Sequence, residues 1–556
     1  MIVVFDRRLQ TCLMLFRFYS LFTALLCGVS LCAAQSQVTL ELIDAQTKAS
    51  IPGWVRILDA SEVPLAIPDH YSRGVGLRGN HPARRWYFCS GPTIFPVPKG
   101  EVFIEAISGI NSEKMRRKLD FRFFDRLTVK LPVRELLPLR DAGWVAGNTH
   151  LHLKNLEEKG ADQYLELVPR GDRLDVVFVS YLERAGDDET YVSNRYRPSG
   201  LSQRSSGETI FGFGQEHRHN FGAWSEGFGH VMFLDIPDLI RPVSVGSGIA
   251  GEGFDFPPLR RGMEAAHEQG GTVIWCHNGL GFEDVPNWLS GRIDVQNIFD
   301  GGSRGDYSET FYRYLDVGMD VPFSTGTDWF IYDFAQVFVK ASKGVSTKNW
   351  LKALREGRSF ITNGPLLTFE MYEGEIGQMN RREIGDRLNL EPGQSIRISG
   401  TAVGRGDFGR LELIHNGIVR HSVEARKTGN HFKAALAFAQ DISEPGWFAL
   451  RTSAQKDANV TVPSPTPIRG SGGNVNEMGE ALFSHTSPIY VDVAGKRRFN
   501  PEAAQELEVQ LEISLESIQA QAMFASPEDR ELVLGIYREA LTDLKARLRS
   551  AARSGN

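Results

Sequence analysis

The sequence contains few cysteines and no long basic segment. Three of its five cysteines lie in the first 32 residues, so only Cys89 and Cys276 remain in the rest of the chain. One pair at most does not make a disulfide scaffold of the kind that stabilises small secreted domains. The 62 Lys and Arg residues are outnumbered by 68 Asp and Glu residues, and the formal net charge is -6. This balance argues against nucleic acid as the main partner.

Long apolar runs are also absent after residue 34, so no later segment is expected to cross a bilayer. The first 34 residues differ, because two arginines precede an apolar run at 11–34 that ends in small residues. This order predicts a secretory signal peptide over residues 1–34, cleaved after Ala34, and therefore an exported protein of the periplasm or the extracellular space. An uncleaved membrane anchor is the alternative. Lipid attachment at Cys32 is disfavoured because the bulky Leu31 precedes it.

The remaining composition is that of a soluble globular protein of about three structural units. Apolar residues make up 42% and charged residues 23% of the 556 residues. Short runs of alternating apolar and polar residues at 37–140 and 366–496 predict an N-terminal and a C-terminal β-sandwich. Residues 497–556 predict a helical hairpin, with helices at 501–521 and 527–552 and Ser526 as the N-cap of the second.

The region 141–365 has a different pattern and is assigned to the α/β class. Apolar strands at 174–180, 272–276 and 321–325 alternate with helix candidates at 258–269 and 308–318. This alternation predicts a parallel sheet or barrel with helices outside. In such folds chemistry gathers on the loops after the carboxyl ends of the strands.

His150 and His152 are the first candidate metal ligands. Residues two apart on a strand point to the same side, so both imidazoles can face one ion. Taken alone, His-x-His is weak, since such histidines are often partly buried polar residues.

Four more segments place ligand-type residues at strand ends. They supply Glu216, His230, His277 and Asp328. A lone strand-end histidine is usually a hydrogen-bonded structural residue. Four histidines, a glutamate and an aspartate in one α/β region together indicate a metal centre.

These motifs resemble the polymerase-and-histidinol-phosphatase (PHP) superfamily, and more closely its CehA/McbA-like metallohydrolases. The resemblance is carried by Trp144, His277 and the segments 147–152, 214–216, 229–231, 324–328, 353–365 and 485–490. It covers nearly the whole mature chain. It implies a distorted (β/α)7 barrel at 141–365, between the two sandwiches, that holds up to three divalent ions.

The resemblance also implies a ligand set. One ion would take His150, His152, Glu216 and Asp328, and a second would share Glu216 and add His230 and His277. Catalytic roles are assigned to Glu216 and His230.

The positions that bind a third ion in the family depart from its pattern. Ser180-Tyr181-Leu182 stands where Thr-Asp-His is usual, and Phe330 replaces a histidine. Glu157 or Glu158 lies near the place of a further missing histidine. We therefore expect two divalent transition-metal ions.

A mixed nitrogen and oxygen ligand set suits Zn²⁺, Mn²⁺ or Fe²⁺ better than Ca²⁺ or Mg²⁺. Two such ions bridged by Glu216 can acidify a water that attacks a carbonyl or phosphoryl centre. The predicted function is an exported metal-dependent hydrolase of a phosphoester, a carbamate or another ester. Its substrate would be a small molecule or envelope-derived material.

His217, Arg218 and His219 are candidate substrate-binding residues. Guanidinium groups fit anionic substrates, although a solvated surface charge is the simpler interpretation of Arg184, Arg195 and Arg218.

A non-catalytic, metal-containing binding or scaffold protein of the cell envelope is the alternative function, and polysaccharide binding by the sandwiches is a weaker one. A structural metal site is closed, whereas a catalytic site keeps an open position.

Overall fold

The computed structural model describes residues 36–183, 191–205, 208–219, 227–246, 253–277, 281–302, 307, 311–341, 344–374, 380–452 and 475–554. The predicted leader at 1–34 and Arg184 lie outside these residues, as do residues 453–474. Within the described part, no helix combines the length and the apolar character that a bilayer crossing requires.

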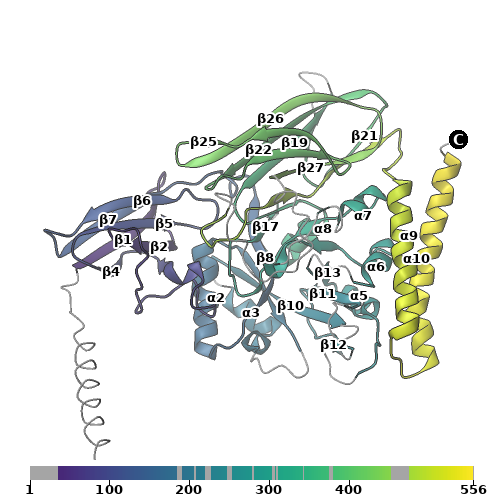
Figure 1. The fold of residues 1–556 in the computed structure, drawn as a ribbon, viewed down its shortest axis with the longest axis horizontal. Helices are drawn as coiled ribbons and strands as arrows, with labels where there is room; N and C mark the ends of the chain where they lie inside the picture. The colour runs from purple at the N-terminus through teal and green to yellow at the C-terminus, as the bar shows by residue number, and fades with distance from the viewer. Residues whose placement is uncertain are drawn as a thin grey trace, which may run out of the picture.

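Two small sheets at the N-terminal end enclose a hydrophobic core of their own (Figure 1). The first contains β4 (Thr93–Val97), β1 (Ser36–Asp44) and β7 (Arg126–Val133). The second contains β3 (Tyr87–Cys89), β2 (Gly53–Leu58), β5 (Glu101–Ile107) and β6 (Met115–Asp120). The alternating residues of β1 explain this arrangement, because Val38, Leu40 and Leu42 are fully buried against the second sheet.

The central feature is one strongly curled, mixed sheet that forms a half-barrel of thirteen strands. In hydrogen-bonded order these are β15 (Phe323–Ser324), β14 (Val295–Asn297), β13 (Thr272–Trp275), β11 (Gly229–Leu234), β10 (Ile210–His219), β9 (Val176–Tyr181), β8 (Trp144–His152), β17 (Gln336–Lys340), β18 (Ser359–Thr362), β28 (Ser484–Thr486), β27 (Gly446–Thr452), β23 (Arg410–His415) and β24 (Ile418–Glu424). Four further strands pair with its members: β12 (Ser244–Val245), β16 (Asp328–Trp329), β21 (Arg387–Leu390) and β29 (Ile489–Val493).

The predicted parallel arrangement is wrong for two strands of the region 141–365, β11 and β17. β17 pairs antiparallel with both β8 and β18. β11 pairs antiparallel with both β10 and β13, whereas β8, β9, β10, β13, β14 and β15 run parallel to one another. The start of β11 therefore lies at the same edge as the carboxyl ends of the parallel strands.

Helices and short 3-10 turns lie between and around the strands of the described chain. They are α2 (Glu158–Asp172), α3 (Pro198–Arg204), α5 (Leu259–Glu268), α6 (Asp284–Leu289), α7 (Arg313–Asp316) and α8 (Thr347–Arg355), with short 3-10 turns η1 (Pro82–Arg85), η2 (Val192–Arg195) and η3 (Asp300–Gly302). Trp350 of α8 lies directly on β8 at Gly147, where a Cβ atom would come within 2.4 Å of the indole. Gly147 therefore sets how closely α8 approaches the strand that carries the first two histidines.

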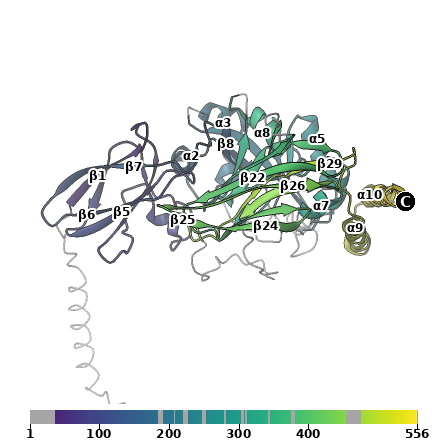
Figure 2. The ribbon, with the colours of Figure 1, turned by 90° about the horizontal axis from the view of Figure 1, so that it is seen from above.

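A five-stranded antiparallel sheet forms the outer layer of the C-terminal region (Figure 2). Its strands are β20 (Asn380–Glu383), β19 (Leu366–Glu373), β22 (Gln394–Gly404), β26 (His431–Ile442) and β25 (Arg426–Thr428). Its partner layer contains β23, β24 and β27, and it continues into the central sheet through β28 and β18. One strand layer of the region predicted as a C-terminal sandwich is therefore part of the half-barrel.

The two C-terminal helices are confirmed. α9 (Pro501–Gln521) and α10 (Pro527–Ser554) lie side by side at the end of the molecule opposite the N-terminal sheets (Figure 1). Ser526 accepts a hydrogen bond from the Asp529 amide at 3.1 Å, as an N-cap does. The hairpin packs on the same chain, because buried Tyr537 joins the central core and Arg260 of α5 pairs with Glu539 at 2.6 Å.

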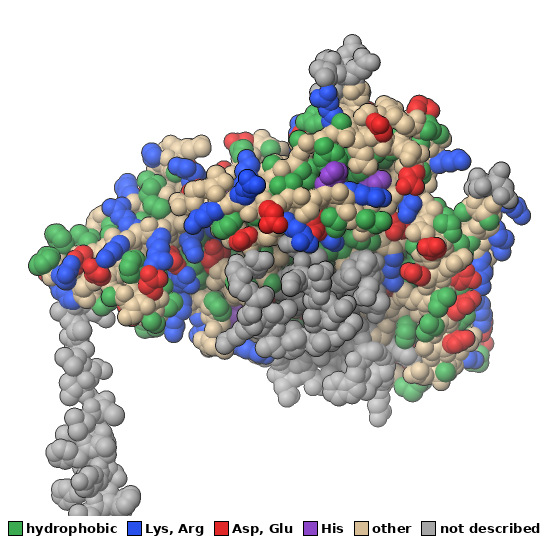
Figure 3. Space-filling view, turned by 45° about the horizontal axis from the view of Figure 1, so that its top comes forward, with side chains coloured by type: hydrophobic (Ala, Val, Ile, Leu, Met, Phe, Trp, Pro, Cys, Tyr) green, Lys and Arg blue, Asp and Glu red, His purple; other side chains and the backbone are tan. Residues whose placement is uncertain are grey.

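Basic and acidic side chains are interspersed along the N-terminal sheets and the outer C-terminal sheet on the face shown in Figure 3. This mixture matches the nearly balanced charge of the sequence.

Candidate metal centre

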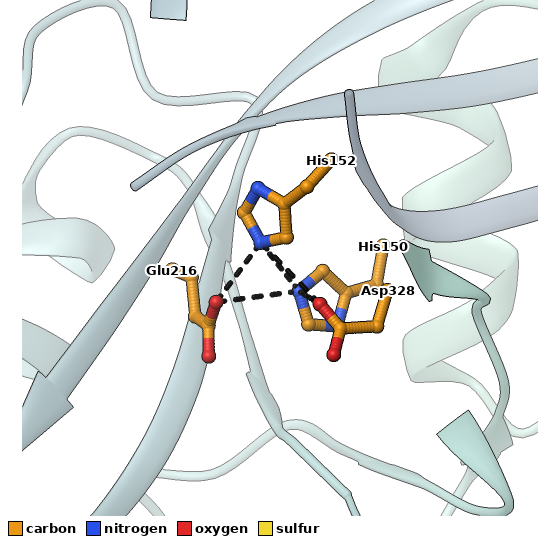
Figure 4. Close-up of side chains that lie close together, drawn as sticks. All are labelled: His150, His152, Glu216 and Asp328. Carbon is orange, nitrogen blue, oxygen red and sulfur yellow. Dashed lines mark hydrogen bonds and ion pairs between the residues drawn. The ribbon is translucent and has the colours of Figure 1, made fainter. Parts of the chain in front are cut away.

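Six residues that the sequence singled out meet at one edge of the curled sheet. They come from the end of β8 (His150 and His152), from β10 (Glu216), from the start of β11 (His230), from the residue after Cys276 beyond β13 (His277) and from β16 (Asp328). Figure 4 shows four of them, His150, His152, Glu216 and Asp328, pointing toward one another. The donor atoms of these four residues all lie within 4.8 Å of one another.

The two histidines of β8 are held by their outer nitrogens. Nδ1 of His152 lies 3.0 Å from the carbonyl oxygen of Ser180, and a carbonyl can only accept, so this nitrogen carries a proton. Nδ1 of His150 lies 2.6 Å from Oδ2 of Asp300 and donates to that carboxylate. Both inner Nε2 atoms are therefore left to face the cluster as lone-pair donors when the rings are neutral.

Four such donors converge. The two histidine Nε2 atoms are 2.9 Å apart. Oε2 of Glu216 lies 2.9 Å from Nε2 of His152 and 3.6 Å from Nε2 of His150. Oδ1 of Asp328 lies 3.5 Å from Nε2 of His150 and 3.7 Å from Nε2 of His152. Tetrahedral ligands about 2.0–2.1 Å from one ion are separated by about 3.3–3.4 Å. The observed distances bracket that value, so this donor group fits a transition-metal ion.

The buried acceptors in the cluster also indicate a site for a cation. Among the described residues, Oδ1 of Asp328 is buried and accepts no hydrogen bond, and Oε1 of Glu216 also accepts none although it forms an ion pair with Arg218 at 3.2 Å. Buried carboxylates left in this state are costly unless a cation neutralises them. In the metal-free chain His150 fills part of that role. Burial opposes its protonation, but Asp300 and Asp328 raise the pKa of His150 well above its ordinary value.

Backbone geometry brings Asp328 to β8. β16 pairs with β8 so that Asp328 lies opposite Leu151, and Gly326 lets the preceding loop lie directly on His150, where a Cβ atom would come within 2.5 Å. Asp328 and His277 both have positive φ values, 56° and 59°. Non-glycine residues in this region are strained, and such strain concentrates at functional sites.

A second donor group shares Glu216 with the first. Oε1 of Glu216 lies 3.5 Å from Nδ1 of His230 and 3.9 Å from Nε2 of His277. Arg218 reaches the same place, with its Nε 3.2 Å from Oε1 of Glu216. Burial and the adjacent guanidinium lower the pKa of His230 well below its ordinary value, so this imidazole is neutral.

Sequence reasoning missed Asp300. It is fully buried in η3, just after β14, and it bonds both His150 and the side-chain amide of Asn297 at 3.0 Å. The 2.6 Å contact with His150 is shorter than the separation of two neighbouring ligands on one ion, about 2.9 Å even at a right angle. Asp300 therefore orients His150 rather than sharing an ion with it. The sequence around it carries no signal that separates it from other loop carboxylates.

His217 and His219 do not reach the cluster. Because successive strand residues alternate, they lie on the opposite face of β10 from Glu216 and Arg218. His217 stacks on Phe233 at 5.2 Å between ring centres, and His219 bonds Asp255 at 3.3 Å. Of the three predicted substrate-binding residues, only Arg218 faces the site.

The positions that the resemblance links to a third ion make other contacts in the structure. Leu182 is fully buried, and Phe330 packs edge-on against Tyr164 at 5.6 Å. Glu158 pairs with Arg195 at 2.8 Å in α2 and η2, which also places Arg195 away from the cluster.

The cluster reaches the surface on one side. The side chains of His150, His152 and Glu216 are 0–2% exposed, whereas those of Asp328 and His277 are 13% and 11% exposed. Trp329 lies beside His152 with ring centres 5.0 Å apart, and Lys154 lies 4.3 Å above the Trp329 ring. An aromatic ring and a positively charged side chain therefore border the exposed side of the cluster.

No protein-family model, no curated protein and no solved structure matches the chain. What the structure adds to the motifs is the buried His, Asp and Glu cluster in a curled mixed half-barrel.

Proposed function

We propose that this chain is an exported metal-dependent hydrolase related to the PHP superfamily, with its metal held by His150, His152, Glu216 and Asp328. The observation that carries the proposal is the convergence of four donors at 2.9–3.7 Å, with both imidazoles fixed from behind by outward hydrogen bonds. Outward partners of this kind set the tautomer and direction of ligating histidines.

A divalent ion bound here would act as a Lewis acid and would lower the pKa of a bound water. The protein side chains supply the rest. Glu216 is held ionised, since Arg218, His150 and His152 lower its pKa well below the ordinary value although burial opposes this. Its carboxylate therefore offers a negative charge to a bound cation. Arg218 and Lys154 carry positive charge near the position where negative charge develops on a carbonyl or phosphoryl oxygen.

Catalysis is favoured over a closed structural site by the exposure of the cluster. Asp328 and His277 are the members that contact solvent. A purely structural site would be enclosed by its four ligands. The proposed substrates are esters, either phosphoesters or carbamates, of small molecules or envelope material. Export rests on the leader at 1–34 and is part of the same proposal.

The test compares the mature chain with His152→Ala and Asp328→Ala, each purified without chelators and loaded with Zn²⁺, Mn²⁺ or Fe²⁺. His267→Ala is the matched control, because the side chain of this α5 histidine bonds Asp294 at 3.0 Å and belongs to none of the donor groups. We expect bound metal in the wild type and the control and at least a tenfold loss of affinity in the other two variants. Hydrolysis of a nitrophenyl phosphate, a nitrophenyl phosphodiester or an aryl carbamate should follow the metal content.

A wild-type chain that binds none of these ions would refute the proposal. Metal binding without hydrolysis of any probe would favour the binding protein instead.

A further inference from the structure

Arg218 lies where a second metal ion would need to bind. β10 and β11 pair so that Arg218 is directly opposite His230, on the face that also carries Glu216. The Arg218 Nε is 3.2 Å from Oε1 of Glu216 and 3.4 Å from Nε2 of His230, and Nη2 is 3.5 Å from Nδ1 of the same ring. The guanidinium thus lies across the imidazole and against the carboxylate.

These are the donors that a second ion would require. The second group consists of Glu216, His230 and His277, and Arg218 contacts the first two of the three. A divalent ion bound to Oε1 of Glu216 would come within a few ångströms of a permanent positive charge on a side chain that is only 13% exposed. Like charges this close in a water-poor environment repel strongly.

The charge balance of the cluster leads to the same conclusion. Glu216, Asp300 and Asp328 carry three negative charges, and Arg218 carries one positive charge. With neutral imidazoles, two negative charges remain, which one divalent ion neutralises. A second divalent ion would leave a buried excess of positive charge.

We propose that Arg218 takes the place of the second metal ion, so that the centre consists of one divalent ion and one guanidinium. This inference rests on the proposed function. The ion occupies the group of His150, His152, Glu216 and Asp328. Arg218 holds Oε1 of Glu216 and presents its outer N–H groups to the negative charge that develops on the substrate, which in a two-ion centre would be the role of the second ion.

The test counts bound ions and does not depend on activity. The full mature chain, Arg218→Met and Arg218→Gln are loaded with Mn²⁺, desalted and analysed for metal per chain and by electron paramagnetic resonance. We expect one ion in the wild type, with the spectrum of an isolated Mn²⁺. The two variants should bind two ions with a spin-coupled spectrum, and His277→Ala added to Arg218→Met should return the count to one. Arg195→Met is the matched control and should bind one ion.

Two ions in the wild type would overturn the inference and leave the proposed function standing. One ion in the wild type and in both folded variants would also overturn it, because Arg218 would then not be what excludes the second ion. No ion in any form would instead overturn the proposed function. If one variant fails to fold, as judged by circular dichroism, the other carries the comparison.

Discussion

Asp300 provides the sharpest test of how the protein builds this centre. It contacts no ion in the proposed arrangement. Its Oδ2 accepts a hydrogen bond from Nδ1 of His150 at 2.6 Å and lies 3.9 Å from Nδ1 of His277. Asp300→Asn keeps the shape of the side chain and an oxygen that accepts the same hydrogen bond, but it removes the charge. Asp300→Ala removes the hydrogen bond as well, and the imidazole then loses its restraint on tautomer and ring direction.

The expected size of the effect follows from the role of such partners. Loss of a hydrogen-bonded carboxylate behind a ligating histidine weakens metal affinity about 10–100-fold, or about 1.4–2.7 kcal/mol. We expect Asp300→Asn at the lower end of this range, because one hydrogen bond survives, and Asp300→Ala at the upper end.

The assay is competition for Zn²⁺ against a chromogenic chelator at neutral pH. Asp255→Asn is the matched control, because Asp255 forms another buried carboxylate–histidine pair, with His219 at 3.3 Å, on the face of β10 opposite to Glu216. Its affinity for Zn²⁺ should equal that of the wild type. If Asp300→Asn and Asp300→Ala also bind Zn²⁺ as tightly as the control, His150 is not oriented by Asp300 and the assignment of its Nε2 to the ion loses its basis.

Two further predictions concern stability. Burial lowers the pKa of His415 to about 4, so between pH 4 and about 6.5 the unfolded chain binds a proton that the folded chain does not. Stability should therefore fall as pH drops through this window, and His415→Phe should remove about 1.4 kcal/mol per pH unit of that slope in urea unfolding; an unchanged slope would contradict the buried neutral state. Arg73 is fully buried and pairs with Asp172 at 2.6 Å, so Arg73→Met should destabilise the fold by about 3–5 kcal/mol, with partial recovery on adding Asp172→Asn. A loss below about 1 kcal/mol in urea unfolding would refute this view of the pair.

Local signals predicted the C-terminal helices well. α9 begins at Pro501 and ends at Gln521, the bounds expected from the sequence, because Asn500 caps its first turn through the Glu502 amide at 3.0 Å and proline fits the first position. The helix expected at 308–318 is recognisable only as the short α7 in the described residues. Caps and prolines act within one turn, so they are readable without tertiary information.

The direction of β11 could also have been read from the sequence. Only nine residues separate the end of β10 from the start of β11. A parallel connection needs a dozen residues or more, so this spacing favours an antiparallel pair. The reversal is what brings His230, at the start of a strand, to the edge where the other ligands lie at strand ends.

The roles of Asp300 and Arg218 were harder to assign in advance. Asp300 is 150 residues from the histidine that it orients, and nothing in its local sequence marks it as different from any other loop carboxylate. Arg218 was singled out with its two neighbouring histidines as one group, although the alternation of a strand already separates it from them. Which face is turned inward depends on how β10 packs on α5, and this is tertiary information.

The strained positions link the fold to the proposed chemistry. His277 and Asp328 adopt a left-handed backbone that costs of order 1–3 kcal/mol for each residue, and surrounding hydrogen bonds must hold them there. On either side of Asp328, the amides of Thr327 and Phe330 donate to the carbonyls of His150 and His152 at 3.1 and 3.0 Å. The carbonyl of His277 accepts from the side chain of Gln296 at 3.2 Å. The first two bonds tie the segment around Asp328 to β8, which carries His150 and His152, and the third ties His277 to β14. The donor geometry is therefore fixed by the backbone before any ion binds, as a preorganised centre requires.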